Sequence, residues 1–444
     1  MKKYLIMLLA AVTLAASCDK DPQVNTYKLT VNSELDGEPF TKAGITVGLK
    51  DNNTGVAYSE NTDENGIATF KVPVGSYEAT VSHTEFDSAL NKSKIYNGVL
   101  SNIVVAANDD NVVTISLTAS THSKVVIKEM YLTGSSYVDA SGANKTYHNA
   151  KYITLYNNSS ESVDISKYGI AMAAPYNGHG PNGYLVDGAL TYAQSSWIPT
   201  TTGAWYFNTS VVMEPYSQIT IAIAGAIDHT VTYSESVDLS HADFACYDPN
   251  SQFNLASQYP TPAESIPASH YMKAAIYTGA KGTAWPVSNN SPAIVIFGLP
   301  EGQTVASWAA DANLLDTSVK GYVNQKLVKD YIIDAVETFS TPNLTKSTKR
   351  LTPDVDAGYV AITNVMGYSV YRNVDKAATE AIAENEGKIV YGYSEGTADK
   401  ENGSTDPSGI DAEASMKNGA KIVFQDTNNS TKDMHQRKKA VLAK

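Results

Sequence analysis

Apolar and polar side chains alternate in short segments along the first quarter of the chain. Turn signals separate these segments: Asn65-Gly66 supplies the positive φ values of a tight turn, and Pro73 and Gly75 end a strand. Short strands of period two without an intervening helix predict a β-sandwich over residues 27–119. The expected strands are 27–32, 45–49, 67–72, 77–81 and 112–117.

The remainder, residues 122–435, carries further strand signals between long irregular stretches. One helix is expected within 315–328 and another at 375–386, with Asp375 as N-cap and Gly387 after its C-terminus. We therefore expect an all-β chain of two sandwich modules, the second with long loop insertions and one or two short helices. Its strands are expected at 123–133, 151–156, 163–165, 218–223, 293–297 and 330–336, and its loops at 175–183, 247–267 and, as a mobile segment, 395–414.

Composition and charge narrow the classes of partner. The 444-residue chain has a formal net charge of −13, which would repel phosphate backbones and argues against nucleic-acid binding. Residues 436–444 are a basic exception that we expect to be a short solvated tail. Tyrosine outnumbers phenylalanine 28 to 9. This bias suits sheet faces in contact with water, because a tyrosine ring can pack while its hydroxyl stays solvated.

The beginning of the chain indicates export. Lys2 and Lys3 precede an apolar run at 5–14, which has the length of a signal-peptide core and is too short to span a bilayer. Small residues follow this run, as they do before a cleavage site. We therefore expect residues 1–17 to be a signal peptide that is removed from the mature protein.

Cys18 is the expected site of lipidation. The stretch Leu-Ala-Ala-Ser-Cys that ends at Cys18 resembles a bacterial lipobox, although Ala15 stands where leucine is usual. The resemblance implies that the acylated Cys18 holds the chain in outer-membrane lipid through a spacer at 18–26. Asp19-Lys20-Asp21 resembles the export signal of Bacteroidetes surface lipoproteins, which implies an exterior location, with the periplasmic face left open. An ordinary secretory signal with an incidental cysteine is the alternative.

Two segments resemble known β-sandwich families. Residues 25–119 are similar to the transthyretin-like, carboxypeptidase-regulatory type, whose modules are usually non-catalytic spacers or adhesion units. Ile127-Lys128-Glu129 and the strand at 151–156 resemble the opening of an immunoglobulin-like lamin-tail domain, from which Thr154 and Tyr168 depart. The two-part layout resembles an uncharacterised family of Bacteroidetes surface lipoproteins, a domain of unknown function, which implies no particular activity.

No arrangement of residues in the sequence predicts catalysis or a bound metal. Cys246 has His241 nearby, but no protease motif surrounds it, and we expect a buried, inert thiol. The histidines offer no pair at the i, i+4 spacing of a helical zinc site. The histidines considered are His179, His229, His241 and His270. We expect no catalytic residue, no metal and no cofactor.

Binding is the role that these observations favour. Trp197 and Trp205 lie in loop-like sequence, where a flat ring could stack on a glycan, and His179 lies in the Gly-rich loop at 175–183. These three residues are the candidate ligand contacts. We expect a non-enzymatic, lipid-anchored surface protein that binds a ligand or partner such as a TonB-dependent receptor in outer-membrane nutrient uptake. A structural or adhesive protein without a small-molecule ligand is the alternative, followed by a hydrolase with residues in the insertions.

Overall fold

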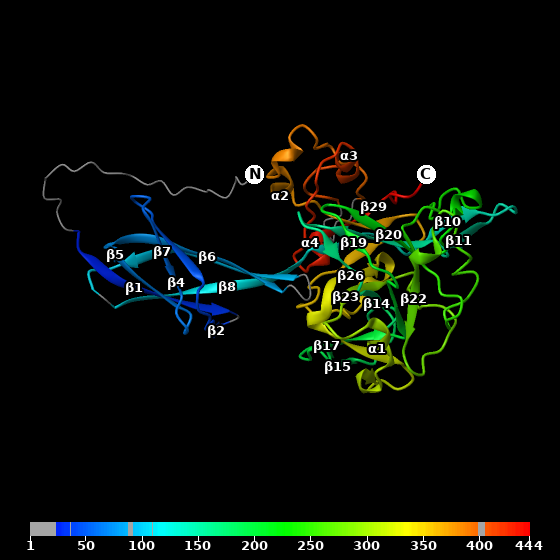
Figure 1. The fold of residues 1–444 in the computed structure, drawn as a ribbon, viewed down its shortest axis with the longest axis horizontal. Coiled ribbons are helices and arrows are strands. Elements are labelled where there is room, and N and C mark those ends of the chain that lie inside the picture. The colour runs from blue at the N-terminus through cyan, green and yellow to red at the C-terminus, as the bar shows by residue number, and fades with distance from the viewer. Residues whose placement is uncertain (1–23, 36, 88–91, 109, 398–404) are drawn as a thin grey trace. The chain divides into compact units, whose positions relative to one another are not determined.

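The computed structural model describes residues 24–35, 37–87, 92–108, 110–397 and 405–444, and the chain divides into two compact units (Figure 1). Unit 1 comprises Met1–His83 and Tyr96–Ala119, and unit 2 comprises Thr84–Ile95 and Ser120–Lys444. Strands dominate the secondary structure, so the prediction of an all-β chain is confirmed. In the described part of the chain, every helix is too short or too polar to cross a bilayer.

The strands of unit 1 enclose one apolar core. Hydrogen bonds link them in the order β2-β1-β8-β7-β6-β3-β4, and β5 pairs with β1. Leu29, Phe70, Tyr77 and Ile115 are among the inward side chains buried in this core. The strands are β1 (Thr26–Leu35), β2 (Glu38–Pro39), β3 (Thr46–Asp51), β4 (Ala57–Asn61), β5 (Ile67–Pro73), β6 (Gly75–Asp87), β7 (Lys92–Val105) and β8 (Asn111–Ser123).

The expected turn before β5 is present and requires its glycine. Gly66 has a φ of +74°, and a Cβ at this position would lie 1.9 Å from the carbonyl oxygen of Phe40. Asp63 Oδ1 accepts hydrogen bonds from the N–H groups of Asn65 (2.8 Å) and Ile67 (3.0 Å). The Asn-Gly pair therefore fixes where β5 begins.

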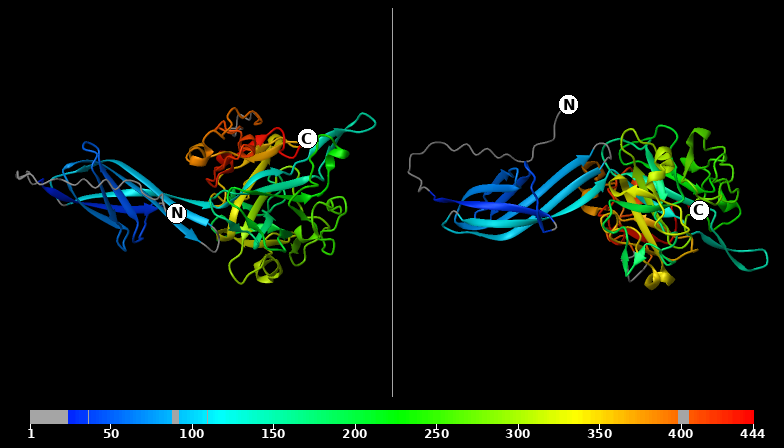
Figure 2. Two further views of the ribbon diagram at one scale, coloured as in Figure 1. Left: turned by 45° about the horizontal axis from the view of Figure 1, so that its top comes forward. Right: turned by 90° about the horizontal axis from the view of Figure 1, so that it is seen from below.

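A twelve-stranded sheet forms the framework of unit 2 (Figures 1 and 2). The sheet rolls up, so that β26 lies beside β9 and β27 lies beside β29. The N–H of Thr363, next to β27, donates to Gln436 Oε1 in β29 at 2.5 Å. In hydrogen-bonded order the strands are β27 (Val360–Ile362), β26 (Ile332–Ser340), β23 (Ala293–Gly298), β14 (Tyr168–Met172), β18 (Gly203–Tyr206), β22 (Tyr271–Ile276), β21 (Phe244–Cys246), β20 (Gln218–Ala224), β12 (Lys151–Asn157), β9 (Val125–Tyr131), β28 (Ser369–Arg372) and β29 (Met434–Arg437).

Smaller elements surround this sheet, and a two-stranded hairpin projects from the body of unit 2 in both views of Figure 2. The small strand groups are β10 (Ser135–Val138) with β11 (Asn144–Tyr147), which form this hairpin, β13 (Val163–Asp164) with β19 (Val212–Met213), β15 (Leu185–Val186) with β16 (Ala189–Leu190), and β17 (Trp197–Thr201) with β25 (Asn324–Val328) and β24 (Leu315–Asp316). The α-helices of the described residues are α1 (Val305–Ala310), α2 (Lys376–Glu380), α3 (Ala412–Lys417) and α4 (Ser430–Asp433), where the sequence predicts one or two. The 3₁₀ turns are His229–Val231, Ala268–His270, Ala312–Leu314, Lys329–Tyr331, Thr341–Lys346 and Ala383–Asn385.

Both faces of the rolled sheet are covered. Ile127, Leu155, Ile221 and Ile296 belong to the apolar cluster on its inner face. On the outer face, α1 and the β17–β25 pair cover one part, and the segment from Val374 onward covers another. Every side chain of β9 and β12 is consequently buried. An alternating pattern predicts a strand with one buried and one exposed face, whereas β9 and β12 are buried on both faces.

Three sequence expectations for unit 2 are wrong. The helix expected within 315–328 is the strand pair β24 and β25, because β25 pairs with β17 instead of coiling locally. The tail expected at 436–444 begins inside the buried strand β29, and Ala440 packs in an apolar cluster. Of the mobile loop expected at 395–414, residues 398–404 lie outside the described residues, whereas the part from 405 onward contains the start of α3, and Ile410 is 1% exposed. The helix with Asp375 as N-cap is present as α2, but it ends at Glu380 instead of 386, and a separate 3₁₀ turn at Ala383–Asn385 precedes Gly387.

A buried charge cluster holds the roll closed. The guanidinium of Arg372 in β28 donates to Ile127 O in β9 at 2.7 Å and to Asp334 in β26, and lies 3.8 Å from Asp426. Asp334 also accepts the N–H of Ile127 at 2.6 Å. Arg372 is 1% exposed. One cation therefore ties three strands and the segment after Phe424 together, and it forms ion pairs with both buried carboxylates.

Candidate functional site

The structure separates the residues that the sequence singled out as ligand contacts. Trp205 lies in β18 and is 0% exposed, with its ring centre 5.4 Å from that of Tyr259. Trp197 lies in β17 with its ring half-buried beneath Lys326 Nζ at 5.0 Å. Both tryptophans are thus in strands rather than loops, and the ring of Trp205 has no face left for a ligand. That expectation for Trp205 is wrong.

His179 and Cys18 complete the set of expected site residues. His179 is half-buried in the loop at 175–183, and its Nδ1 has no hydrogen-bond partner among the described residues. Cys18 lies outside the described residues. Trp205 belongs to the apolar cluster on the inner face of the sheet, whereas Trp197 packs against the cluster on its outer face. The three expected ligand contacts therefore do not make a common site within the described structure.

The chemistry-bearing side chains elsewhere are engaged in the fold. Cys246 is buried, and burial raises the pKa of its thiol well above the usual value. His229 Nε2 donates to Gly225 O at 2.6 Å, and its Nδ1 accepts from Tyr147 at 2.7 Å. Across the part of the chain that the structure describes, no three His, Cys, Asp or Glu side chains are grouped to hold a metal ion.

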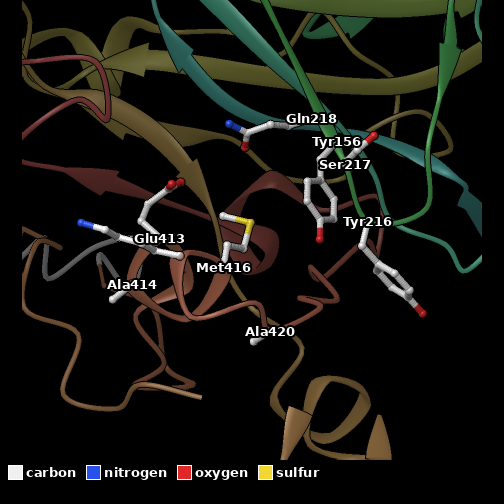
Figure 3. A pocket seen from close by; sticks show the side chains of 9 residues that line it. Tyr156, Tyr216, Ser217, Gln218, Glu413, Ala414, Met416 and Ala420 are labelled. Atoms are coloured by element: carbon white, nitrogen blue, oxygen red, sulfur yellow. The ribbon is translucent and has the colours of Figure 1, made fainter. Parts of the chain in front are cut away.

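A pocket on the outer side of unit 2 is the strongest candidate for a functional site (Figure 3). It is an open cavity of about 550 Å³, which is within the usual size of small-molecule sites. Figure 3 shows Met416 between Glu413 and the two tyrosines. The lining residues come from the end of β12, the start of β20 and helix α3, and they are Tyr156, Tyr216, Ser217, Gln218, Glu413, Ala414, Met416, Lys417 and Ala420.

A buried lysine fixes the polar wall of this pocket. Lys128 in β9 is 1% exposed, and its Nζ donates to Gln218 Oε1 and to Glu413 Oε1, both at 2.5 Å. Tyr371 donates to the same Glu413 oxygen at 2.7 Å. Gln218 and Glu413 come from elements far apart in sequence, yet the shared lysine holds them on one side of the cavity. Their positions are set before any ligand arrives.

The carboxylate of Glu413 is ionised. Burial opposes its ionisation, but the charge of Lys128 and the hydrogen bonds from Lys128 and Tyr371 outweigh burial and hold the pKa of Glu413 below its usual range. Lys128 balances this charge, so the wall presents polar groups without an unpaired charge. Both recorded bonds to Glu413 use Oε1, and within the described residues Oε2 has no recorded partner.

Local sequence explains why these side chains reach the pocket. Asp411 caps helix α3 by accepting the N–H of Ala414 at 3.0 Å, and Gly419 follows the helix with a φ of +80°. Tyr216 occupies the turn before β20 with a φ of +54°, and Ser217 Oγ donates to Glu214 O at 2.8 Å. The cap and the turn place Glu413 and Tyr216 on opposite sides of the cavity.

Sequence reasoning missed this pocket. The sequence predicts the strand at 218–223 but gives Tyr216, just before it, no role, and Glu413 lies in the segment expected to be a mobile loop. The signal for α3 was present: Asp411 precedes Ala-Glu-Ala-Ser-Met-Lys, and Gly419 follows it. The proximity of Glu413 to Tyr216 depends on tertiary packing, which no local pattern reveals.

The fold and the pocket define an all-β protein with an open cavity that is lined by both polar and apolar side chains. Residues 214–408 match the family described as "Protein of unknown function (DUF4876)". This range includes Tyr216 and Gln218 and ends before Glu413. No curated protein matches the chain.

The chain is also similar to solved structures. One is a DUF4876 family protein from Bacteroides thetaiotaomicron VPI-5482, with 21% identity and a TM-score of 0.51, covering 93% of this chain and 95% of that one. Another is a DUF3823 family protein from Parabacteroides merdae, with 11% identity and a TM-score of 0.16, covering 43% of this chain and 92% of that one. The first similarity extends over both units and shows the fold alone.

Proposed function

We propose that this chain is a non-enzymatic binding protein of the cell surface, anchored through acylated Cys18, and that the pocket between Tyr216 and Glu413 binds a neutral carbohydrate. The observation that carries the ligand class is the pair of side chains held by Lys128. Because Gln218 Oε1 and Glu413 Oε1 each lie 2.5 Å from Nζ, the two oxygens are at most 5.0 Å apart. The lysine occupies those oxygens and leaves the outer atoms of both groups for a ligand.

Those outer atoms are complementary to neighbouring hydroxyl groups. Gln218 offers an amide NH₂ donor, and Glu413 Oε2 offers a charged acceptor. A sugar presents adjacent hydroxyls that both donate and accept, so one hydroxyl can meet each atom. The ring of Tyr216 and the side chain of Met416 supply an apolar surface for the carbon face of a sugar. Lys128 balances the charge of Glu413, so this wall does not require a charged ligand, although the exposed Lys417 also lines the cavity.

The accessory role in nutrient uptake belongs to the same proposal. It is supported by the resemblance of the first 21 residues to a lipoprotein signal, and a TonB-dependent receptor is the partner proposed for it. Replacing the lipidated cysteine tests the anchor directly. In membrane fractionation we expect Cys18→Ala to move the protein from the membrane to the soluble fraction, whereas retention of this variant in membranes would contradict the anchor.

The binding proposal is tested on an array of neutral mono- and oligosaccharides. We expect the purified protein to bind at least one glycan, and Tyr216→Ala and Gln218→Ala each to weaken this binding about tenfold or more, the cost of about 1.4 kcal/mol of lost contact. Tyr322→Ala is the matched control, because Tyr322 is a 44% exposed tyrosine outside the pocket. The proposal fails if no glycan binds, or if both pocket variants bind as the control does.

A further inference from the structure

Unit 2 has a second cavity, which is lined by the segment from Glu380 to Tyr391. Its volume is about 480 Å³, and its lining includes Glu380, Ile382, Asn385, Ile389 and Tyr391. We infer that the two cavities are adjoining subsites of one groove and that the ligand is a linear oligosaccharide rather than a single sugar. This inference rests on the proposed function and adds the length of the ligand to it.

Lys421 joins the two cavities. Its N–H donates to Asn385 Oδ1 and its carbonyl accepts from Asn385 Nδ2, both at 2.7 Å, so Asn385 of the second cavity is fixed beside it. Lys421 Nζ lies 5.7 Å from the centre of the Tyr216 ring in the first cavity. The preceding residue, Ala420, lines that first cavity. Ala420 thus lines the first cavity, and the next residue, Lys421, is hydrogen-bonded to a lining residue of the second, which is why we place the two cavities side by side along this dipeptide.

The two cavities share one apolar floor. Met416 of the first cavity and Ile389 of the second both pack against the same buried cluster, which contains Ile422 and Phe424. In Figure 1, α2 and α3, which contribute Glu380 and Glu413 to the two cavities, lie in the same part of unit 2. A common floor holds the spacing between subsites constant, as a chain of linked sugars requires.

The second cavity repeats the chemistry of the first. Tyr391 is 54% exposed, yet its hydroxyl donates to Glu380 Oε1 at 2.6 Å and Lys376 Nζ lies 5.6 Å from the ring centre, so the ring is held in place. Glu384 at the boundary is paired with Lys421 at 3.2 Å. Each cavity thus offers a tyrosine ring beside a carboxylate that is paired with a lysine, and the second cavity is also lined by the exposed Glu386. A second neutral sugar unit fits this set for the same reason as the first.

The test measures how affinity depends on ligand length. The probes are linear gluco-, manno-, xylo- and galacto-oligosaccharides of one to six units, titrated by calorimetry into the purified wild-type protein and into Tyr391→Ala. We expect Kd to fall at least tenfold between the monosaccharide and the longer members of the series that binds. Tyr391→Ala should remove most of this gain and leave the monosaccharide Kd within twofold of wild type, and Tyr322→Ala should change neither.

The outcomes separate this inference from the proposed function. The inference of a groove is overturned if Kd does not depend on ligand length, or if Tyr391→Ala keeps the gain in affinity of the longer ligands. The first cavity then remains a site for a single sugar. Failure of all four series overturns the inference, and failure of the glycan array as well overturns the proposed function. Thermal unfolding of Tyr391→Ala should match that of Tyr322→Ala, because both rings are exposed, so misfolding cannot imitate the expected result.

Discussion

Removing the cation of the buried charge cluster should strongly destabilise unit 2. In Arg372→Met, the side chain keeps much of its length, but Asp334 and Asp426 lose the guanidinium that lies against them. Breaking a buried ion pair by removing one partner costs about 3–5 kcal/mol, because the remaining charge stays buried without compensation. Unit 2 has about 340 residues, and an unfolding entropy of about 2.1 cal/mol/K per residue then gives an expected fall in Tm of about 4–7 °C.

The loss should depend on pH. Burial raises the pKa of Asp334 and that of Asp426 above the usual range of a carboxyl, and the charge of Arg372 opposes this rise. Lowering the pH therefore favours the protonated carboxyls, which need the guanidinium less. Removing Arg372 raises both pKa values further, so the stability of the variant relative to wild type falls as the pH rises from 5 to 8.

Urea unfolding followed by tryptophan fluorescence measures this effect. Trp197, Trp205, Trp285 and Trp308 are the four tryptophans of the chain and all lie in unit 2, so the signal reports on that unit. Lys376→Met is the control, because Lys376 is 52% exposed and lies 4.0 Å from Glu380; a surface pair of this kind contributes about 0.5 kcal/mol or less. If Arg372→Met unfolds like the control at pH 8, or loses as much stability at pH 5 as at pH 8, the account of the cluster is wrong.

Three further variants probe single buried positions. Burial and the charge of Arg437 lower the pKa of His435 from 6.5 to about 3. The free energy of unfolding of the wild type should therefore fall by about 1.4 kcal/mol per pH unit as the pH falls from 6.5 to 3. Urea unfolding of His435→Gln should not show this fall. Burial lowers the pKa of Lys151 from 10.5 to about 7, so Lys151→Met should abolish the rise in wild-type stability between pH 7 and 10.5, and an unchanged slope would contradict this. Gly225 has a φ of +67°, and a Cβ there would lie 2.4 Å from His229 Nε2, so Gly225→Ala should cost about 2 kcal/mol or more, and a Tm equal to that of wild type would refute the clash.

Local patterns predicted the elements whose formation depends on local chemistry. Asn65-Gly66 set the turn before β5, and Asp375 capped α2, because a positive φ and an N-cap bond each involve only neighbouring residues. The expected strand at 293–297 became β23, because an apolar run of this length suits a strand buried on both faces. These features lie within a few residues of the signal that predicts them.

Elements that are stabilised by residues distant in the sequence could not be predicted from local sequence patterns. The basic composition of residues 436–444 predicts a solvated tail, yet Arg437 lies 5.1 Å from the ring centre of Tyr371. His435, just before this segment, is neutral, and Tyr393 donates to its Nε2 at 2.6 Å. Those tyrosines are more than 40 residues away, so no charge count along the chain reveals that they bury the basic side chains. The strand β4 was missed for the opposite reason, because none of its side chains is buried and it shows no apolar face.

The candidate site was the least accessible to sequence reasoning. Tryptophan was chosen because flat rings can stack on sugars, but a large ring is more often part of a core, as Trp205 is. The pocket instead uses Tyr216 and two side chains oriented by Lys128, which belongs to the Ile-Lys-Glu segment that the sequence linked only to a fold. The arrangement of its side chains depends on three strands and one helix that meet around Lys128.

The position of a bound sugar tests the central claim most directly. In a crystal structure of the protein with the glycan that binds it most tightly, we expect a sugar ring against Tyr216, with neighbouring hydroxyls within hydrogen-bond distance of Gln218 Nε2 and Glu413 Oε2. Lys128 should keep its bonds to both side chains, because the site is formed before binding. A glycan bound elsewhere on the protein, or bound here without contact to Gln218 and Glu413, would contradict the account.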